Sequence, residues 1–109
     1  MSYLINKKIL GLIGLSARAR KVLFGADSVE EGIKKNKVKL IIISCEASNR
    51  TKDKFKKIAE QHQKPVIVAG TIEELSKAIG KNNKAILGIL DENLSNEIQK
   101  INNGGEVIG

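Results

Sequence analysis

The single cysteine offers the first chemistry that the sequence could perform, because a thiolate is a strong nucleophile. Cys45 lies in the segment SCEASNRT, where Arg50 follows it after four residues and could place a cation near the sulfur. A reactive thiol needs an electropositive setting, and a loop of this kind usually contains glycine so that backbone N–H groups turn inward. The segment has no glycine, and Glu46 adds a negative charge beside the sulfur. We therefore expect Cys45 to end a buried strand as an inert thiol.

The single histidine offers acid–base or metal chemistry, but it lacks partners. His62 falls on the apolar face of a predicted helix near its C-terminal end, and no serine, cysteine or acidic residue stands at a recognisable catalytic spacing from it. One cysteine and one histidine cannot form a Cys/His zinc site or a disulfide within the chain. Glycine motifs that bind phosphates, of the GxGxxG and GxxxxGK types, are absent. The sequence therefore predicts a non-catalytic protein without metal or cofactor.

Basic residues gather in the first half of the chain and point to a polyanionic partner. Residues 1–57 contain 14 Lys and Arg against 5 Asp and Glu, residues 58–109 contain 5 against 7, and the net charge is +7. Such asymmetry attracts nucleic acid through long-range fields and counterion release. With one tyrosine and two phenylalanines, a base-stacking platform is not expected. The cations form three clusters: Arg18, Arg20 and Lys21; Lys34, Lys35, Lys37 and Lys39; and Arg50, Lys52, Lys54, Lys56 and Lys57.

Hydrophobic spacing predicts helices that alternate with short buried strands. The expected helices cover about 4–19, 28–36, 51–62, 71–80 and 92–102, and the expected strands cover 21–24, 39–44, 65–69 and 85–90. Thr71 with Glu74 three residues later predicts a capping box, and Gly80 is typical of a helix end. This order indicates an α/β protein whose helices cover both faces of one sheet. The loops 25–28 and 45–51 follow strands, where such sheets bind ligands.

The turn between the first strand and the second helix is open to two uses. In VLFGADSVEEGIKKNK, a helical pattern begins directly behind Asp27 and Ser28. Ser28 and Glu31 have the spacing of a capping box, and Asp27, Glu30 and Glu31 are acids of the kind that stabilise the first turn of a helix. These carboxylates also repel phosphate. The residues therefore predict a helix that caps itself, at a place where an anion could otherwise bind.

Three segments carry a resemblance to a known family. They are LSARARKVLFG, KLIIIS with the polar loop behind it, and KPVIVAGTIEELSKAIG, of which the last is the most specific. In their order they resemble the ribosomal-protein family that binds kink-turn RNA, and more closely its short bacterial branch, the YlxQ type. The resemblance covers about residues 9–90. It implies a three-layer α/β/α sandwich with a four-stranded mixed sheet, in which the last strand runs antiparallel, and it implies RNA binding.

The RNA signature of this family is Gly-x-Asn-Glu-x-x-Lys, at the turn after the first strand. It falls on four residues of this chain: Gly25, Asp27, Ser28 and Glu31. The resemblance implies that Asp27 and Ser28 lie against the edges of bases. Because three of the four positions carry other residues than the signature, specificity for kink-turns is left open.

The resemblance also implies which cations hold the RNA backbone. The antiparallel last strand places Lys81 and Lys84 beside the turn, where they and Arg50 hold phosphates, with Lys21 as an outlying helper. In kink-turn binders the loop before the last strand carries apolar side chains, whereas here it is Lys81-Asn82-Asn83-Lys84. Such a loop suits a phosphate backbone better than an extruded base.

The expected partner is structured RNA, either ribosomal RNA or another kink-turn-like RNA, with ribosomal, translation or transcription proteins as further candidates. We expect a cytoplasmic monomer of one domain, residues 1–109, with a loose tail from about residue 103. No apolar run approaches the roughly 18 to 20 residues of a membrane span, and the N-terminus lacks a secretory signal. Two alternatives stay open: a protein-interaction module that kept the fold and lost RNA recognition, and a rhodanese-like sulfurtransferase that uses Cys45.

Overall fold

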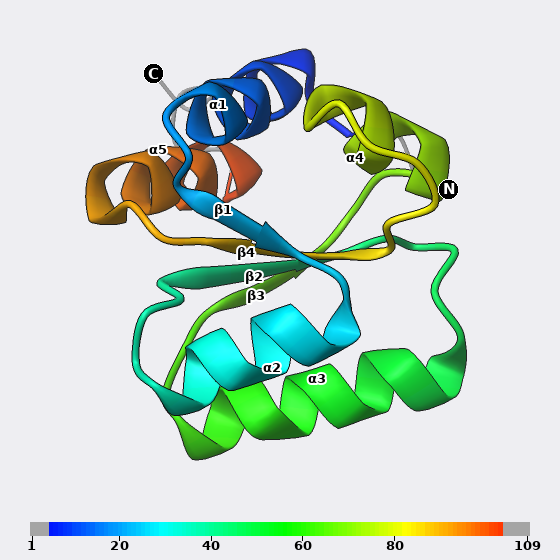
Figure 1. Cartoon of the computed structure of the whole chain (residues 1–109), viewed down its shortest axis with the longest axis vertical. Helices are drawn as coiled ribbons and strands as arrows, with labels where there is room; N and C mark the ends of the chain where they lie inside the picture. The colour runs from blue at the N-terminus through cyan, green and yellow to red at the C-terminus, as the bar shows by residue number, and fades with distance from the viewer. Residues whose placement is uncertain (1–4, 104–109) are drawn as a thin grey trace.

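The polypeptide folds into three layers, with a sheet between two layers of helices (Figure 1). The structure is a computed structural model that describes residues 5–103. The predicted three-layer sandwich with a four-stranded mixed sheet is confirmed. In chain order, helices and strands alternate: α1 Lys7–Arg18, β1 Val22–Phe24, α2 Ala26–Lys34, β2 Leu40–Ile43, α3 Asn49–Gln61, β3 Val66–Val68, α4 Ile72–Ala78, β4 Ile86–Ile89 and α5 Glu92–Asn102.

The last strand enters the sheet between the first two, so that the strand order is β1-β4-β2-β3. β4 runs antiparallel to both β1 and β2, whereas β2 and β3 are parallel. The predicted direction of the last strand is therefore confirmed. Its register brings Leu87 opposite Phe24 and Ile86 opposite Ile43. As a result, the C-terminal ends of β1, β2 and β3 meet the N-terminal end of β4 at one end of the sheet, which we call the loop end.

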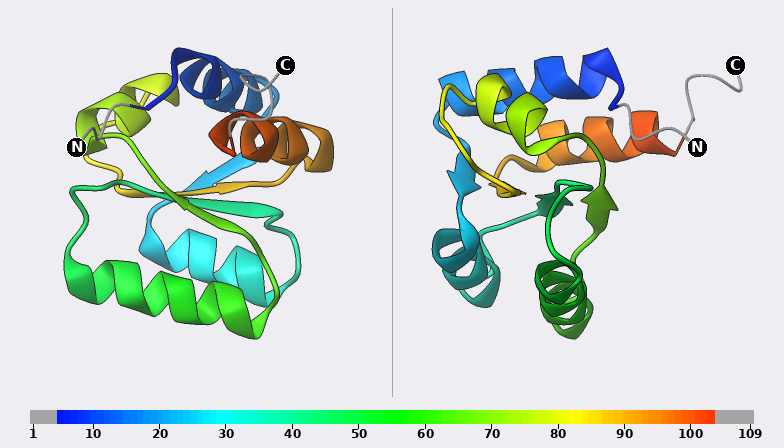
Figure 2. Two further views of the ribbon diagram at one scale, coloured as in Figure 1. Left: turned by 180° about the vertical axis from the view of Figure 1, so that it is seen from behind. Right: turned by 90° about the vertical axis from the view of Figure 1, so that its right-hand side faces the viewer.

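The sheet is covered on both faces because its central strand alternates apolar side chains between two cores. Leu40 and Ile42 face a core shared with α1, α4 and α5, and Ile41 and Ile43 face a second core shared with α2 and α3. All four side chains are fully buried, which is typical of a strand in the middle of an α/β sheet. Figure 2 shows the same division of the helices from the back and from the side. None of the helices among residues 5–103 is long and apolar enough to cross a membrane.

Local signals predicted most boundaries. α5 covers Glu92–Asn102 as expected, and Thr71 and Glu74 form the predicted capping box. α1 begins at Lys7, three residues later than predicted, because the Asn6 side chain accepts a hydrogen bond of 2.7 Å from the Lys8 N–H and caps the helix there. α2 begins earlier than predicted, at Ala26. The predicted loose tail, apart from residue 103, lies outside the described residues.

A glycine lets α2 approach β1 closely. A Cβ atom on Gly32 would lie 2.5 Å from Cδ1 of Leu23 and 2.9 Å from Cγ2 of Val38, closer than side chains pack. A side chain at this position would therefore force the side chains of Leu23 and Val38 to shift. The close approach fixes α2 against the strand that precedes it, and so fixes the start of α2 at the loop end of the sheet.

Candidate nucleic-acid interface

Backbone hydrogen bonds hold neighbouring loops together at the loop end. The Gly25 N–H donates to the Ile86 carbonyl at 3.0 Å, and the Ser44 N–H donates to the Ala85 carbonyl at 2.8 Å. The Cys45 N–H donates to the Gly70 carbonyl at 2.9 Å, which brings in the turn before α4. The β1–α2 turn, the loop after β2 and the loop before β4 therefore form one continuous surface, as the resemblance implied for the first and the last of them.

The start of α2 leaves hydrogen-bond donors unused. Gly25 is the N-cap residue, with φ 89° and ψ 151°, and it has no side chain that could cap the helix. The first helical bond runs from the Val29 N–H to the Gly25 carbonyl at 3.1 Å. The N–H groups of Ala26, Asp27 and Ser28 find no acceptor among the described residues. By contrast, a side chain caps each of the other four described helices: Asn6, Ser48, Thr71 and Asp91.

The prediction that Ser28 and Glu31 form a capping box is wrong. Ser28 is the third residue inside the helix, because β1 and its bond to β4 fix Gly25 as the last non-helical residue. Glu31 pairs instead with Lys35 at 3.0 Å, one turn further along. Of the three acids expected in the first turn, only Asp27 is there. The side chains of Asp27 and Ser28 are exposed and have no partner among residues 5–103.

The loop before β4 is held in place by one buried serine that the sequence reasoning missed. The Ser76 hydroxyl accepts from the Lys84 N–H at 2.7 Å and donates to the Lys84 carbonyl at 3.2 Å. The Ser76 carbonyl also accepts from the Lys81 N–H at 2.8 Å. Both ends of the segment Lys81–Lys84 are therefore tied to α4. A small polar residue on the buried face of a short helix was the available signal.

The two lysines of this loop gather at the end of β1. The Nζ atoms of Lys81 and Lys84 lie 5.3 and 5.5 Å from the centre of the Phe24 ring, within the range of a cation–π contact. Neither ammonium has an ion-pair partner within residues 5–103. Phe24 directly precedes Gly25. Two cations without an ion pair in the described part of the chain therefore lie against the ring of the residue that precedes the N-cap of α2.

Arg50 reaches the same end of the sheet from a different helix. It is the second residue of α3, is exposed, and has no ion-pair partner in the described part of the chain. Ser48 caps this helix, since its hydroxyl accepts from the Thr51 N–H at 3.1 Å. α3 therefore contributes the Arg50 guanidinium to the loop end, and its cap leaves fewer open N–H groups than the start of α2 has.

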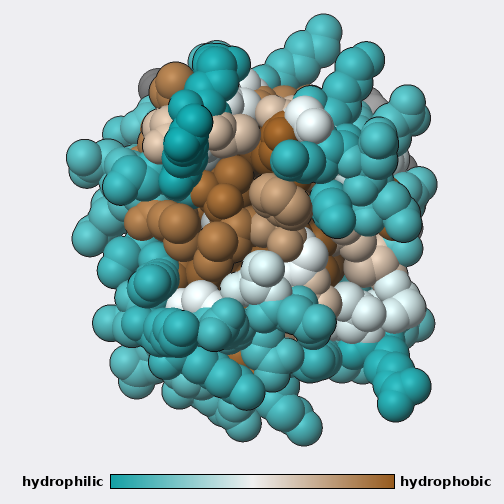
Figure 3. Space-filling view, in the orientation of Figure 1, coloured by the Kyte–Doolittle hydropathy of each residue, from teal (hydrophilic) through white to brown (hydrophobic). Residues whose placement is uncertain are grey.

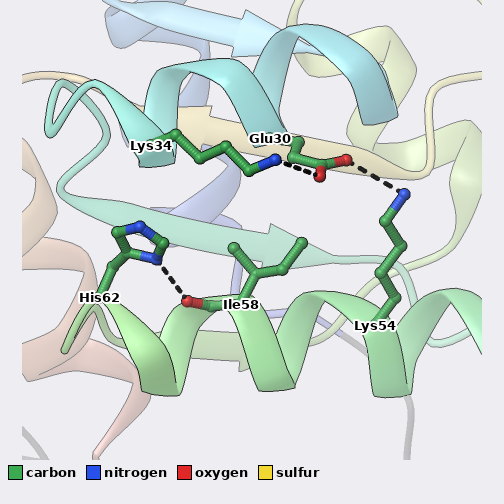
Figure 4. A network of polar contacts seen from close by, with 5 residues as sticks. All are labelled: Glu30, Lys34, Lys54, Ile58 and His62. Atoms are coloured by element: carbon green, nitrogen blue, oxygen red, sulfur yellow. Dashed lines mark hydrogen bonds and ion pairs between the residues drawn. The ribbon is translucent and has the colours of Figure 1, made fainter.

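A carboxylate joins α2 to α3. Glu30 lies between Lys34 and Lys54, with N–O distances of 3.1 Å to each, as Figure 4 shows. Lys54 and then Lys34 hydrogen-bond the carboxylate and hold the pKa of Glu30 below its ordinary value. The bridge sets the start of α3, and with it Arg50, relative to the start of α2.

Lys21 lies apart from these residues. It directly precedes β1, and its carbonyl accepts from the Leu90 N–H at 2.8 Å, at the C-terminal end of β4. Lys21 and Gly25 are four positions apart along an extended chain, a distance of about 13 Å. The strand between Lys21 and Gly25 lies on an apolar part of the surface. β1 is half-buried, and the face on which it lies is hydrophobic in its centre and hydrophilic around it (Figure 3).

The two residues that suggested catalysis have structural surroundings. Cys45 is half-buried at the end of β2, and its backbone N–H is used in the bond to Gly70. His62 ends α3, and its Nδ1 lies 3.0 Å from the Ile58 carbonyl, to which it donates (Figure 4). His62 is partly buried, which agrees with its predicted place on the apolar face near the end of this helix.

Comparison with known proteins places this arrangement in a family. Residues 7–99 match the family described as ribosomal protein L7Ae/L30e/S12e/Gadd45. A protein of Enterococcus faecium named RNA-binding protein YlxQ is 29% identical over 99 residues, which are 91% of this chain and 95% of that protein. The protein of the same name from Bacillus subtilis (strain 168) is 29% identical over 87 residues, 80% of this chain and 87% of that protein.

Two solved structures show the same fold. A Bacillus halodurans protein of unknown function superposes with a TM-score of 0.85 at 34% identity and covers 88% of this chain and 97% of its own. The Giardia lamblia 15.5kD RNA binding protein superposes with a TM-score of 0.76 at 18% identity, over 97% of this chain and 94% of its own. At that identity the second likeness concerns the fold alone.

Proposed function

The chain belongs to the ribosomal protein L7Ae/L30e/S12e/Gadd45 family, and from this premise we propose that it binds structured RNA with the loop end of its sheet and catalyses no reaction. Its YlxQ relatives are named RNA-binding proteins, and they match it over most of their length. Ribosomal RNA in the cytoplasm is the partner that this family membership favours.

The observation that carries the proposal is the set of unused positive groups at the start of α2. Within residues 5–103, three N–H donors at the start of α2 have no acceptor, and the ammoniums of Lys81 and Lys84, which lie over the ring of the neighbouring residue Phe24, have no ion-pair partner. Helix N-termini of this kind bind phosphate because their N–H groups and the helix dipole both favour an anion. With Arg50 at the start of α3, the surface can hold several phosphates of one RNA strand.

Asp27 and Ser28 are the groups that could read bases. Both side chains are exposed beside the phosphate-binding groups. A carboxylate can accept hydrogen bonds from a base amino group, and a hydroxyl can donate or accept. Glu31, the fourth position of the family signature, is engaged with Lys35 and points along the helix surface instead. We therefore propose that contacts to the RNA backbone supply most of the affinity, and that kink-turn reading is weak.

A paired titration tests both parts of the proposal. A kink-turn RNA is compared with the same RNA whose sheared G·A pairs are changed to Watson–Crick pairs, at about 50 and 200 mM salt. We expect the two RNAs to differ less than tenfold in Kd and to lose affinity together as salt rises. A preference of tenfold or more, about 1.4 kcal/mol, means that Asp27 and Ser28 do read the G·A pairs. If neither RNA binds at low salt, the RNA-binding proposal fails and the partner is a protein.

A further inference from the structure

A second cationic surface lies at the end of the sheet opposite to the loop end. We propose that it holds the phosphate backbone of RNA, as a second contact region for the RNA bound at the loop end. The inference rests on the proposed function for the class of partner, but not on the residues of the loop end. We call this surface the far-end band, and its members are Arg20, Lys21, Lys35, Lys37, Lys39 and Lys64.

The sheet topology brings together two basic clusters that are separate in the sequence. Lys21 directly precedes β1 and Lys39 directly precedes β2, and these strands flank β4 on its two sides. The Leu90 N–H donates to the Lys21 carbonyl at 2.8 Å, and the Lys39 N–H donates to the Ile89 carbonyl at 2.7 Å. The two lysines therefore bracket the C-terminal end of β4, two strand spacings or about 10 Å apart.

Two shallow hollows are lined by four members of the band, whereas Arg20 belongs to it as the sequence neighbour of Lys21. One, of about 230 Å³, has Lys35 and Lys37 in its lining together with Leu90, whose N–H donates to the Lys21 carbonyl. The other, of about 290 Å³, is lined by both Lys39 and Lys64. The cations thus form one band across the starts of β1, β2 and β3, and not isolated positions on the surface.

The charges of the band are largely unneutralised. Within residues 5–103, Lys35 is the one member with an ion-pair partner, Glu31 at 3.0 Å. The acids that border the band are Glu31, Asp91 and Glu92. The Asp91 carboxylate is occupied as the cap of α5, since it accepts from the Leu94 N–H at 2.8 Å. The band therefore keeps an excess of positive charge.

Helix ends do not account for most of these cations. Lysine and arginine are expected in the last turn of a helix, where they meet the negative end of its dipole. Lys21, Lys37 and Lys39, however, lie outside the helices, in the connections that lead into β1 and β2. The family signature does not include them either, so neither ordinary cause explains their convergence.

The composition of the band favours a polyanion over a protein partner. Stable protein interfaces depend on buried aromatic or arginine anchors, and the band has no aromatic residue and only one arginine. Phosphate backbones, by contrast, bind to clustered lysines through counterion release and need no apolar anchor. The face on which β1 lies has an apolar centre (Figure 3). RNA that contacts both the band and the loop end must span the distance from Lys21 to Gly25, about 13 Å.

Three charge variants test the inference on the whole chain. The far-end variant carries Lys21→Gln, Lys37→Gln and Lys39→Gln, and the loop-end variant carries Lys81→Gln and Lys84→Gln. The control variant carries Lys7→Gln, Lys57→Gln and Lys100→Gln, exposed lysines without an ion pair in the described part of the chain. It removes the same net charge as the far-end variant. The probe is a kink-turn RNA with both stems extended, titrated over a series of salt concentrations.

The expected result is a loss of two to three units in the slope of log K against log salt for the far-end variant, at about 0.9 per lost phosphate contact. The control variant is expected to change the slope by less than one unit. If the far-end and control variants give the same slope, the far-end band does not bind RNA. The slope of the loop-end variant then still decides the proposed function. If the loop-end variant alone leaves the slope unchanged, the proposed site at the loop end is wrong, whereas RNA binding by the far-end band is supported.

Folding of the variants is checked so that a structural loss is not mistaken for a lost contact. Lys39 is half-buried, whereas Lys37 is exposed. The single variant Lys37→Gln is therefore measured as well, with an expected slope change of about one unit. An unchanged slope for Lys37→Gln, in a chain with wild-type circular dichroism, contradicts the inference. A wild-type chain that binds no RNA overturns both proposals.

Discussion

Gly25→Ala isolates the backbone conformation on which the start of α2 depends. Gly25 has φ 89° and ψ 151°, a region that side chains almost never enter. A Cβ atom placed there would meet no atom within 4 Å, so that no steric contact contributes to the result. We therefore expect Gly25→Ala to lower the free energy of unfolding by about 1–3 kcal/mol, through backbone strain alone.

Gly11→Ala is the matched control, because it makes the same chemical change with the opposite expected sign. Gly11 lies inside α1, and a Cβ atom on it would also meet nothing within 4 Å. Alanine is favoured over glycine in a helix interior, and we expect a gain of about 0.5–1 kcal/mol. Urea unfolding followed by far-UV circular dichroism measures both variants, with equal m-values as the check on two-state behaviour.

Two outcomes refute the reasoning. If Gly25→Ala changes stability by less than about 0.5 kcal/mol, as an ordinary surface substitution does, the strained backbone is not required. If Gly11→Ala destabilises as much as Gly25→Ala, the effect belongs to any added methyl group. A strained turn would also reorient the α2 N–H groups that we propose to bind phosphate, so Gly25→Ala is expected to weaken RNA binding even where the chain is fully folded.

Three further predictions concern single side chains. Arg50→Ala and Lys84→Ala are each expected to weaken binding of all RNAs about equally and to lower the slope of log K against log salt by about one unit. The control Lys100→Ala is expected to leave that slope unchanged. If salt titrations give the same slope for all three variants, Arg50 and Lys84 do not belong to the site. Ser76→Ala leaves the Lys84 N–H and carbonyl without partners and is expected to cost about 1–3 kcal/mol. The control Ser16→Ala should lower the free energy of unfolding by less, because among the described residues the Ser16 hydroxyl bonds Leu12 of its own helix. If amide exchange at Lys84 is no faster in Ser76→Ala than in wild type, Ser76 does not hold the loop before β4 in place. Because Lys54 and Lys34 lower the pKa of Glu30, its carboxylate stabilises the fold above the ordinary pKa of 4.5 and loses that contribution as pH falls through the lowered pKa. Urea unfolding over a pH series is expected to show Glu30→Gln less stable than wild type at neutral pH and convergent with it in acid, unlike Asp53→Asn; a difference that persists at low pH contradicts the ion-pair explanation.

Signals between neighbouring residues were sufficient to predict most helices and strands and to recognise the family. Leu40 to Ile43 is a run of aliphatic residues too short for a helix, and it is the buried central strand. The Thr71 and Glu74 pair predicted a cap because both of its hydrogen bonds lie within four residues of chain. The sequence also placed Gly25 at the turn after the first strand, through the resemblance of the surrounding segments to a known family.

Tertiary structure decided how α2 begins and which cations meet. Ser28 and Glu31 have the spacing of a capping box, but the hydrogen bond from Gly25 to Ile86, a residue 61 positions away, makes Gly25 the N-cap and leaves Ser28 inside the helix. Ser76 and Lys84, or Lys21 and Lys39, likewise come together through strand pairing and helix packing. The amino-acid sequence by itself determined the elements, because their signals lie within a few neighbouring residues. The site depends on contacts between distant residues, and only the strand order and register decide those.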